Sequence, residues 1–228
     1  CRERAEAGEG LFGFVLWAFV ETSAAIIREN VGFIMMQKNI IRIALGTGLI
    51  LLIPLVAMQF TEEVNWDLFD FAFMGTLLFG TGLTYELVTR KASNVVYRVG
   101  VGVAVTAAFL LVWVNGAVGI IGSEGNDANL MYGGVLVVGA IGAIIARFKP
   151  KGMARALFAT ALAQTLVAVI ALVGRLGSPY SGPLEIVSVN GFFVALFAGS
   201  AVLFWKAARG RPAGSDGTRE TPWPSDVP

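Results

Sequence analysis

Long apolar stretches separated by short polar segments dominate this chain. A helix that crosses about 30 Å of hydrocarbon needs about 20 mostly apolar residues. Six stretches meet this requirement, with predicted bounds at residues 40–60, 68–89, 99–121, 130–146, 153–173 and 184–205. Their apolar residues run on without the period-two alternation of a β-barrel strand. The pattern therefore predicts an all-α integral membrane bundle of six transmembrane helices, in which short connections make successive helices antiparallel neighbours.

Basic residues lie on one set of alternate loops and predict the orientation. The opposite loops carry only Arg175 among the 17 Lys and Arg residues of the chain. The basic set comprises Lys38, Arg42, Arg90, Lys91, Arg98, Arg147, Lys149, Lys151, Arg155, Lys206, Arg209 and Arg211. Because Lys and Arg are enriched in cytoplasmic loops, both ends of the six-helix domain, residues 37–209, are expected in the cytoplasm (N-in/C-in).

The two ends of the chain differ from this domain. Residues 1–36 hold a ten-residue apolar run, too short to span alone, and we predict an N-terminal extension. It is interpreted as an interfacial helix or as a segment translated upstream of a start at Met35 or Met36. A seventh helix and a lipidated Cys1 are the alternatives. Residues 210–228 are rich in Gly, Pro, Ser, Thr and Asp, which predicts a disordered cytoplasmic tail.

Composition agrees with a membrane protein and excludes several kinds of site. Hydrophobic residues make up 56% of the chain and charged residues 14%, with a mean hydropathy of +0.72. Soluble domains carry about 25% charged residues. The absence of His and the single Cys exclude a disulfide framework, a Cys/His zinc site and a His-based triad. We therefore predict no catalytic, cofactor-binding or metal-binding residue and no cofactor.

Few polar side chains fall inside the predicted spans. Glu86 is the only acid well inside one, and Arg90 at i+4 favours an interfacial ion pair over a proton relay. Gln164, Asn115 and Asn190 lie in the fifth, third and sixth spans. We interpret them as interhelical hydrogen-bonding residues, with a ligand site as the alternative.

Acidic residues gather on the side opposite the basic loops. Asp67 and Asp70 accompany Glu62 and Glu63 around Trp66, and a second acidic segment, residues 123–127, is predicted on the same side. Charge asymmetry alone explains these acids. The alternative is a site for a hard cation, which prefers oxygen ligands.

Small and aromatic residues indicate how the helices pack. Small residues recur at spacings of four in three spans, at Gly100/Ala104/Ala108, Gly139/Ala143 with Gly142/Ala146, and Gly191/Ala195/Gly199. They predict close packing within the bundle, with a dimer face as the alternative. The sequence Gly-Thr-Gly-Leu occurs at 46–49 and 80–83, which predicts contact between the first two helices or, alternatively, a narrow polar path. Trp66, Tyr132 and Tyr180 outside, with Tyr97 and Trp205 inside, fit aromatic belts.

Three stretches carry a resemblance. Residues 65–71 (NWDLFDF), 78–87 (LFGTGLTYEL) and 152–164 (GMARALFATALAQ) resemble an uncharacterised family of small bacterial multi-span inner-membrane proteins. The resemblance covers about residues 36–175. It implies a location in the bacterial cytoplasmic membrane and no particular activity.

Three functions are compatible with these features. The first is an accessory or structural multi-pass protein whose partners are the lipid bilayer and, through small-residue helix faces, other copies of itself, with no nucleic acid. The second is a small-solute or ion transporter or channel that uses Gln164, Asn115 and Asn190. The third is a membrane enzyme with an acidic outer site. Because chemistry-bearing residues are scarce, the first is preferred.

Overall fold

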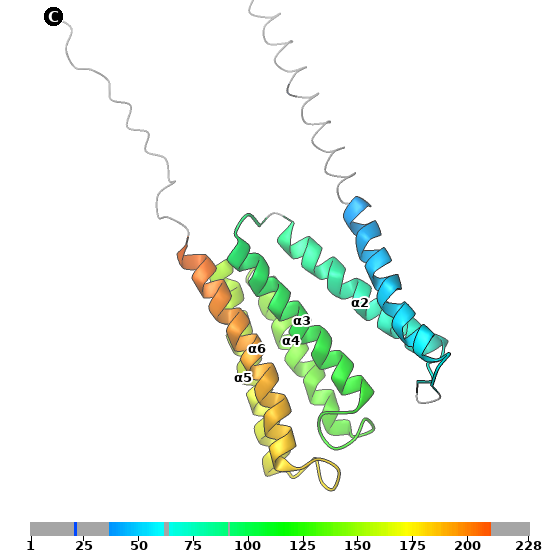
Figure 1. Cartoon of the computed structure of the whole chain (residues 1–228). Coiled ribbons are helices and arrows are strands. Elements are labelled where there is room, and N and C mark those ends of the chain that lie inside the picture. The colour runs from blue at the N-terminus through cyan, green and yellow to red at the C-terminus, as the bar shows by residue number, and fades with distance from the viewer. Residues whose placement is uncertain (1–20, 22–36, 62–63, 91, 211–228) are drawn as a thin grey trace, which may run out of the picture. The chain divides into compact units, whose positions relative to one another are not determined.

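The computed structural model describes residues 21, 37–61, 64–90 and 92–210, and this described part is helical without strands (Figure 1). Six of its helices are long and apolar enough to cross a membrane, as predicted. They are Gln37–Ala57, α2 (Leu68–Thr89), α3 (Val95–Ala117), the segment Asp127–Ile145, α5 (Pro150–Val173) and α6 (Pro183–Arg209). The fourth combines a 3-10 turn, η1 (Asp127–Leu130), with α4 (Met131–Ile145). The chain is thus a multi-pass membrane protein.

Contacts divide the chain into two compact units at the boundary between Leu83 and Thr84. The predictions made for residues 1–36 and 210–228 lie outside the described residues, apart from Glu21 and Gly210.

The first unit contains an antiparallel helical hairpin. A Cβ built at Gly82 would lie 2.8 Å from Ile43, and one built at Gly75 would lie 3.4 Å from Leu51. These two contacts fix the pairing of α2 with Gln37–Ala57. The repeated Gly-Thr-Gly-Leu contributes only in part, because within the hairpin a Cβ at Gly46 or Gly48 would meet nothing within 4 Å. The predicted contact between the first two helices is therefore present at Gly82 of the second copy, and no close contact is made at Gly46 or Gly48 of the first.

The start of α2 coincides with its predicted bound because two carboxylates cap it. The Asp67 carboxylate accepts from the Asp70 N–H, and the Asp70 carboxylate accepts from the Asp67 N–H, both at 2.9 Å. This reciprocal arrangement is a capping box, which satisfies amides that have no partner in the first turn of a helix.

The third span lies four residues earlier than predicted. Its first turn is capped by Asn94, whose Oδ1 accepts from the N–H groups of Val96 at 2.8 Å and Tyr97 at 3.3 Å. At the other end Gly119 adopts φ +69°, and a Cβ there would lie 2.4 Å from the Ser123 backbone. This left-handed turn, which glycine adopts without a steric penalty, ends the helix although apolar residues continue beyond it.

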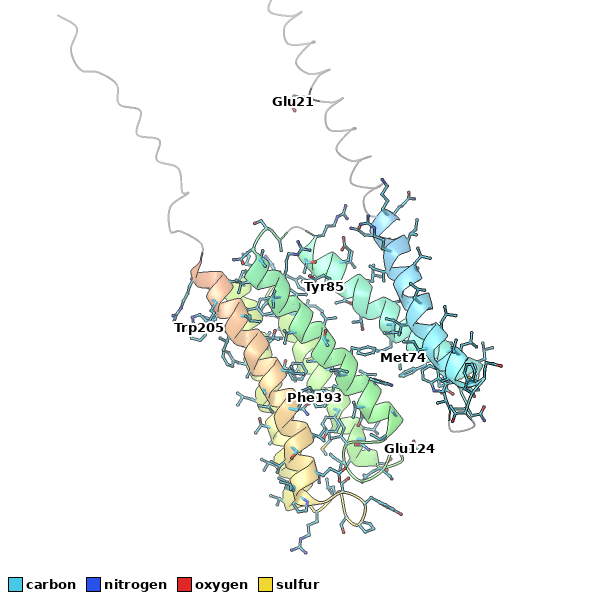
Figure 2. The ribbon with its side chains drawn as sticks, in the orientation of Figure 1. Glu21, Met74, Tyr85, Glu124, Phe193 and Trp205 are labelled. Carbon is cyan, nitrogen blue, oxygen red and sulfur yellow. The ribbon has the colours of Figure 1, made fainter. Side chains whose placement is uncertain are left out.

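The second unit is a bundle in which α5 packs between α4 and α6, and α3 packs on α6 (Figure 1). Its interior is built from fully buried side chains that include Leu111, Phe193 and Phe204. Phe193 points into the bundle in Figure 2. Small residues bring backbones together, since a Cβ at Gly142 would lie 2.7 Å from the Ala156 Cβ. The close packing predicted for the fourth span is confirmed at this contact.

The small-residue stripes of the other spans have different outcomes. Gly100 in α3 is buried, and its carbonyl accepts from the Ser200 hydroxyl of α6 at 2.7 Å, so the prediction of close packing holds there. Gly191, Ala195 and Gly199 are exposed on α6. Within the second unit this stripe makes no close packing contact, because α6 buries the face that carries Phe193 and Phe197 instead.

Side-chain amides fold the two loops at the acidic end of this unit. The Oδ1 of Asn129 accepts from the N–H groups of Ile120 at 3.1 Å and Ile121 at 2.9 Å, and its Nδ2 donates to the Ser123 carbonyl at 2.7 Å. Asn126 donates across to the Leu176 carbonyl at 2.8 Å. The loop after α3 is therefore folded and tied to the α5–α6 connection, and it buries residues that were predicted to be helical.

Candidate functional site

Two of the predicted polar residues meet inside the bundle. The Nε2 of Gln164 on α5 donates to the Oδ1 of Asn190 on α6 at 2.9 Å. The hydroxyl of Tyr132 on α4 donates to the same oxygen at 3.0 Å. The exposed fractions of these side chains are 0% for Gln164 and 1% for both Asn190 and Tyr132. A single acceptor oxygen thus joins three helices, and we call these three side chains the amide cluster.

The amide cluster is nearly saturated with hydrogen bonds. The Nδ2 of Asn190 donates to the Ile186 carbonyl one turn earlier at 2.8 Å, which orients the side chain and leaves its Oδ1 free for the two interhelical donors. The Oε1 of Gln164 is the exception, since this buried oxygen has no hydrogen-bond partner. A buried acceptor without a donor costs stability. The cluster offers this one oxygen to a further donor.

Asn115 does not join the amide cluster. Its Nδ2 donates to the Asn129 carbonyl at 3.3 Å, near the end of α3, and its buried Oδ1 has no partner. The side chain therefore joins α3 to η1. The prediction that Asn115 is an interhelical hydrogen-bonding residue is confirmed, because Asn129 belongs to η1, the first turn of the fourth span.

The acidic candidates have local roles where they are described. Asp67 and Asp70 form the capping box of α2, whereas Glu62 and Glu63 lie outside the described residues. Among the described residues, no group of three or more His, Cys, Asp or Glu side chains lies close enough to hold a metal ion. Glu86 is partly buried in the last turn of α2, and its pairing with Arg90 stays a prediction.

Two tyrosines assigned to the aromatic belts are interior residues, so that assignment is wrong for both. Tyr132 belongs to the amide cluster. Tyr97 is 6% exposed, packs edge-on against Phe204 at 5.0 Å between ring centroids, and donates to the Phe148 carbonyl at 2.8 Å. A buried tyrosine needs a hydrogen-bond partner for its hydroxyl, and each of these finds one on another segment. Trp205 and Tyr180 are exposed, as residues of a belt would be.

Sequence reasoning missed Tyr132 and Asn129 as organising residues. A tyrosine near a span end has the composition signal of an interfacial belt, and an asparagine beside a loop has that of a turn. What identifies Tyr132 as an interior residue is that it faces Asn190, and what identifies Asn129 is that it faces the loop after α3. Both depend on helical register, which composition does not report.

Comparison with protein-family models, curated proteins and solved structures finds no match to this chain.

Proposed function

We propose that this chain is an accessory or structural multi-pass protein of the bacterial cytoplasmic membrane, with both ends of its six-helix domain in the cytoplasm. The observation that carries the proposal is the use made of the candidate polar side chains. Asn190 and Gln164 link helices, Asn115 joins α3 to η1, and Asp67 with Asp70 caps a helix. Side chains engaged in this way hold the fold together and need no substrate to explain them.

The proposed location rests on sequence features. Basic loops alternate with acidic ones, which supports the N-in/C-in orientation. The resemblance to small bacterial inner-membrane proteins supports the compartment.

An accessory protein needs a protein neighbour, and α6 presents a suitable face. Its stripe of Gly191, Ala195 and Gly199 is exposed, and a Cβ built at either glycine would meet nothing within 4 Å. Small residues at spacings of four allow another helix to approach closely in lipid. A second copy of this chain is the proposed neighbour at this stripe.

Photocrosslinking within the membrane tests the role. A photoreactive amino acid at Ala195 should give a discrete protein adduct, with twice the mass of the chain if the neighbour is a second copy. The matched position is Leu162 on α5, which is 71% exposed and lies on no small-residue stripe. Adducts with lipid alone at both positions would contradict an accessory role that uses this face.

Transport is the second candidate, and the unpartnered Oε1 of Gln164 is the observation that favours it. An exposed polar path would require further donors and acceptors near this oxygen. The purified chain in liposomes should pass small ions no faster than empty liposomes do, according to the first proposal. Ion flux that Gln164→Leu abolishes, in a variant that remains folded, would favour transport instead.

A further inference from the structure

Positive charge is concentrated at one end of the second unit. Among its described residues, the basic side chains at this end are Arg90, Arg98, Arg147, Lys149, Lys151, Arg155, Lys206 and Arg209, and the only acid is Glu86. The other end carries Arg175 together with Glu124, Asp127 and Glu185. Tyr85 and Trp205 mark the basic end in Figure 2. Since the helices are span-length, this end lies at the depth of the lipid headgroups.

A cavity of about 890 Å³ opens among four segments at this end. Its wall combines the guanidinium-bearing residues Arg90 and Arg147 with the apolar residues Leu87, Val88 and Phe148. The remaining wall comes from Thr84, the connection between α2 and α3, the first turn of α3, Pro150 and the end of α6. The cavity thus combines two arginine residues with an apolar surface, which is the complement of an anionic amphiphile.

The loop that carries Arg147 is held in place. Arg147 and Phe148 adopt φ values of +48° and +56°, a left-handed conformation that is uncommon for residues other than glycine. The Phe148 carbonyl accepts from the Tyr97 hydroxyl at 2.8 Å, and its N–H donates to the Ala143 carbonyl at 3.3 Å. A Cβ at Gly152 would lie 2.6 Å from the Ala146 Cβ, so α5 begins directly against the end of α4. This packing positions the Arg147 backbone before any ligand arrives.

We propose that this cavity binds the phosphate headgroup of an anionic glycerophospholipid. The phosphate lies between Arg90 and Arg147, whose planar guanidinium groups suit bidentate hydrogen bonding to phosphate oxygens. The acyl chains follow the wall formed by Leu87, Val88 and Phe148. A free phosphate ion would leave that apolar wall unused. Basic pockets between transmembrane helices bind anionic headgroups in this manner. The binding site itself does not depend on the proposed orientation. Only its assignment to the cytoplasmic leaflet does.

Lipid binding to the purified full chain in detergent tests this site. Native mass spectrometry and thermal unfolding would be recorded with phosphatidylglycerol, with phosphatidylcholine and with inorganic phosphate. Phosphatidylglycerol should bind more tightly than phosphatidylcholine and should raise the unfolding temperature. In the double variant Arg90→Gln/Arg147→Asn, binding should weaken about tenfold or more, because two headgroup contacts are lost. Asparagine is chosen because it tolerates the left-handed conformation of Arg147.

The matched control removes two charges from the same end without altering the cavity wall. Lys151→Gln/Arg155→Gln does so, since neither residue lines the cavity. Equal loss of binding in both double variants would show a diffuse attraction and overturn the site. Equal binding of phosphatidylcholine, or displacement of the lipid by inorganic phosphate, would overturn the lipid assignment. If the double variant fails to fold, Arg147→Asn alone against Arg155→Gln makes the same comparison. The orientation is measured by a separate experiment. A wrong orientation is therefore distinguishable from the absence of the lipid site.

Discussion

One oxygen atom, the Oδ1 of Asn190, accepts hydrogen bonds from two other helices. In lipid, helices gain no hydrophobic stabilisation by associating, so packing and such polar contacts decide which helices meet. The three members of the amide cluster are unequal, however. Asn190 serves two interhelical donors, whereas Gln164 makes one interhelical bond and leaves its own oxygen unpartnered. Substituting Asn190 should therefore cost more stability than substituting Gln164.

We predict that Asn190→Leu destabilises the chain more than Gln164→Met does. The first change leaves the Tyr132 hydroxyl and the Gln164 amide without an acceptor, and should cost about 1–3 kcal/mol. The second removes one bond together with the unpartnered oxygen, and should change the stability by less than about 1 kcal/mol. Unfolding in mixed micelles with increasing SDS, followed by circular dichroism, measures both. Equal losses would contradict the asymmetry assigned to the cluster.

Sequence alone predicts the two amide members of the cluster, Gln164 and Asn190, but not Tyr132. Gln164 and Asn190 stand out because amides in apolar spans require partners. Tyr132 does not, since a tyrosine near a span end is typical of an interfacial belt. Hydrophobicity along the chain carries no information on which face of α4 turns toward α6.

Helix bounds were predictable where local chemistry marks them. The bounds of α2 were predicted because Asp67 precedes an apolar run and charged residues follow it. The predicted third span begins and ends four residues too far along the chain. Its predicted end includes Ile120 and Ile121, which are apolar like membrane-spanning residues but are buried in a folded loop. A hydropathy window does not distinguish apolar residues covered by lipid from those covered by the protein's own loop.

Close contact between α4 and α5 gives a prediction about helix packing. Gly142→Leu should destabilise the chain by about 1–3 kcal/mol, because its Cβ would lie 2.7 Å from the Ala156 Cβ and α5 must move. Gly134→Leu on the same helix is the matched control, since a Cβ there would meet nothing within 4 Å. Both changes gain similar helix propensity. The SDS unfolding assay should separate them, and an equally stable Gly142→Leu variant would refute the tight contact.

Over the whole chain, charge is distributed between alternate span ends. The polar interior positions hold uncharged side chains, whereas Lys and Arg lie at alternate span ends and most acids at the others, with Arg175 and Glu86 as the exceptions. The scarcity of interior charge leaves little for sequence reasoning about chemistry. It also makes the two span-end surfaces the chemically distinct parts of the chain, and their assignment to compartments is testable.

Cysteine labelling should establish the proposed orientation. In a background with Cys1→Ser, which removes the only native cysteine, the single changes Ser93→Cys, Gly125→Cys and Lys151→Cys are introduced one at a time. Gly125 is exposed, and a Cβ there would meet nothing within 4 Å, so its substitution should leave the loop intact. A membrane-impermeant maleimide applied to intact cells should label the chain at position 125 alone, because alternate loops face opposite sides. Positions 93 and 151 should react only after permeabilisation. Labelling of 93 and 151 from outside would invert the orientation and place the lipid site in the other leaflet.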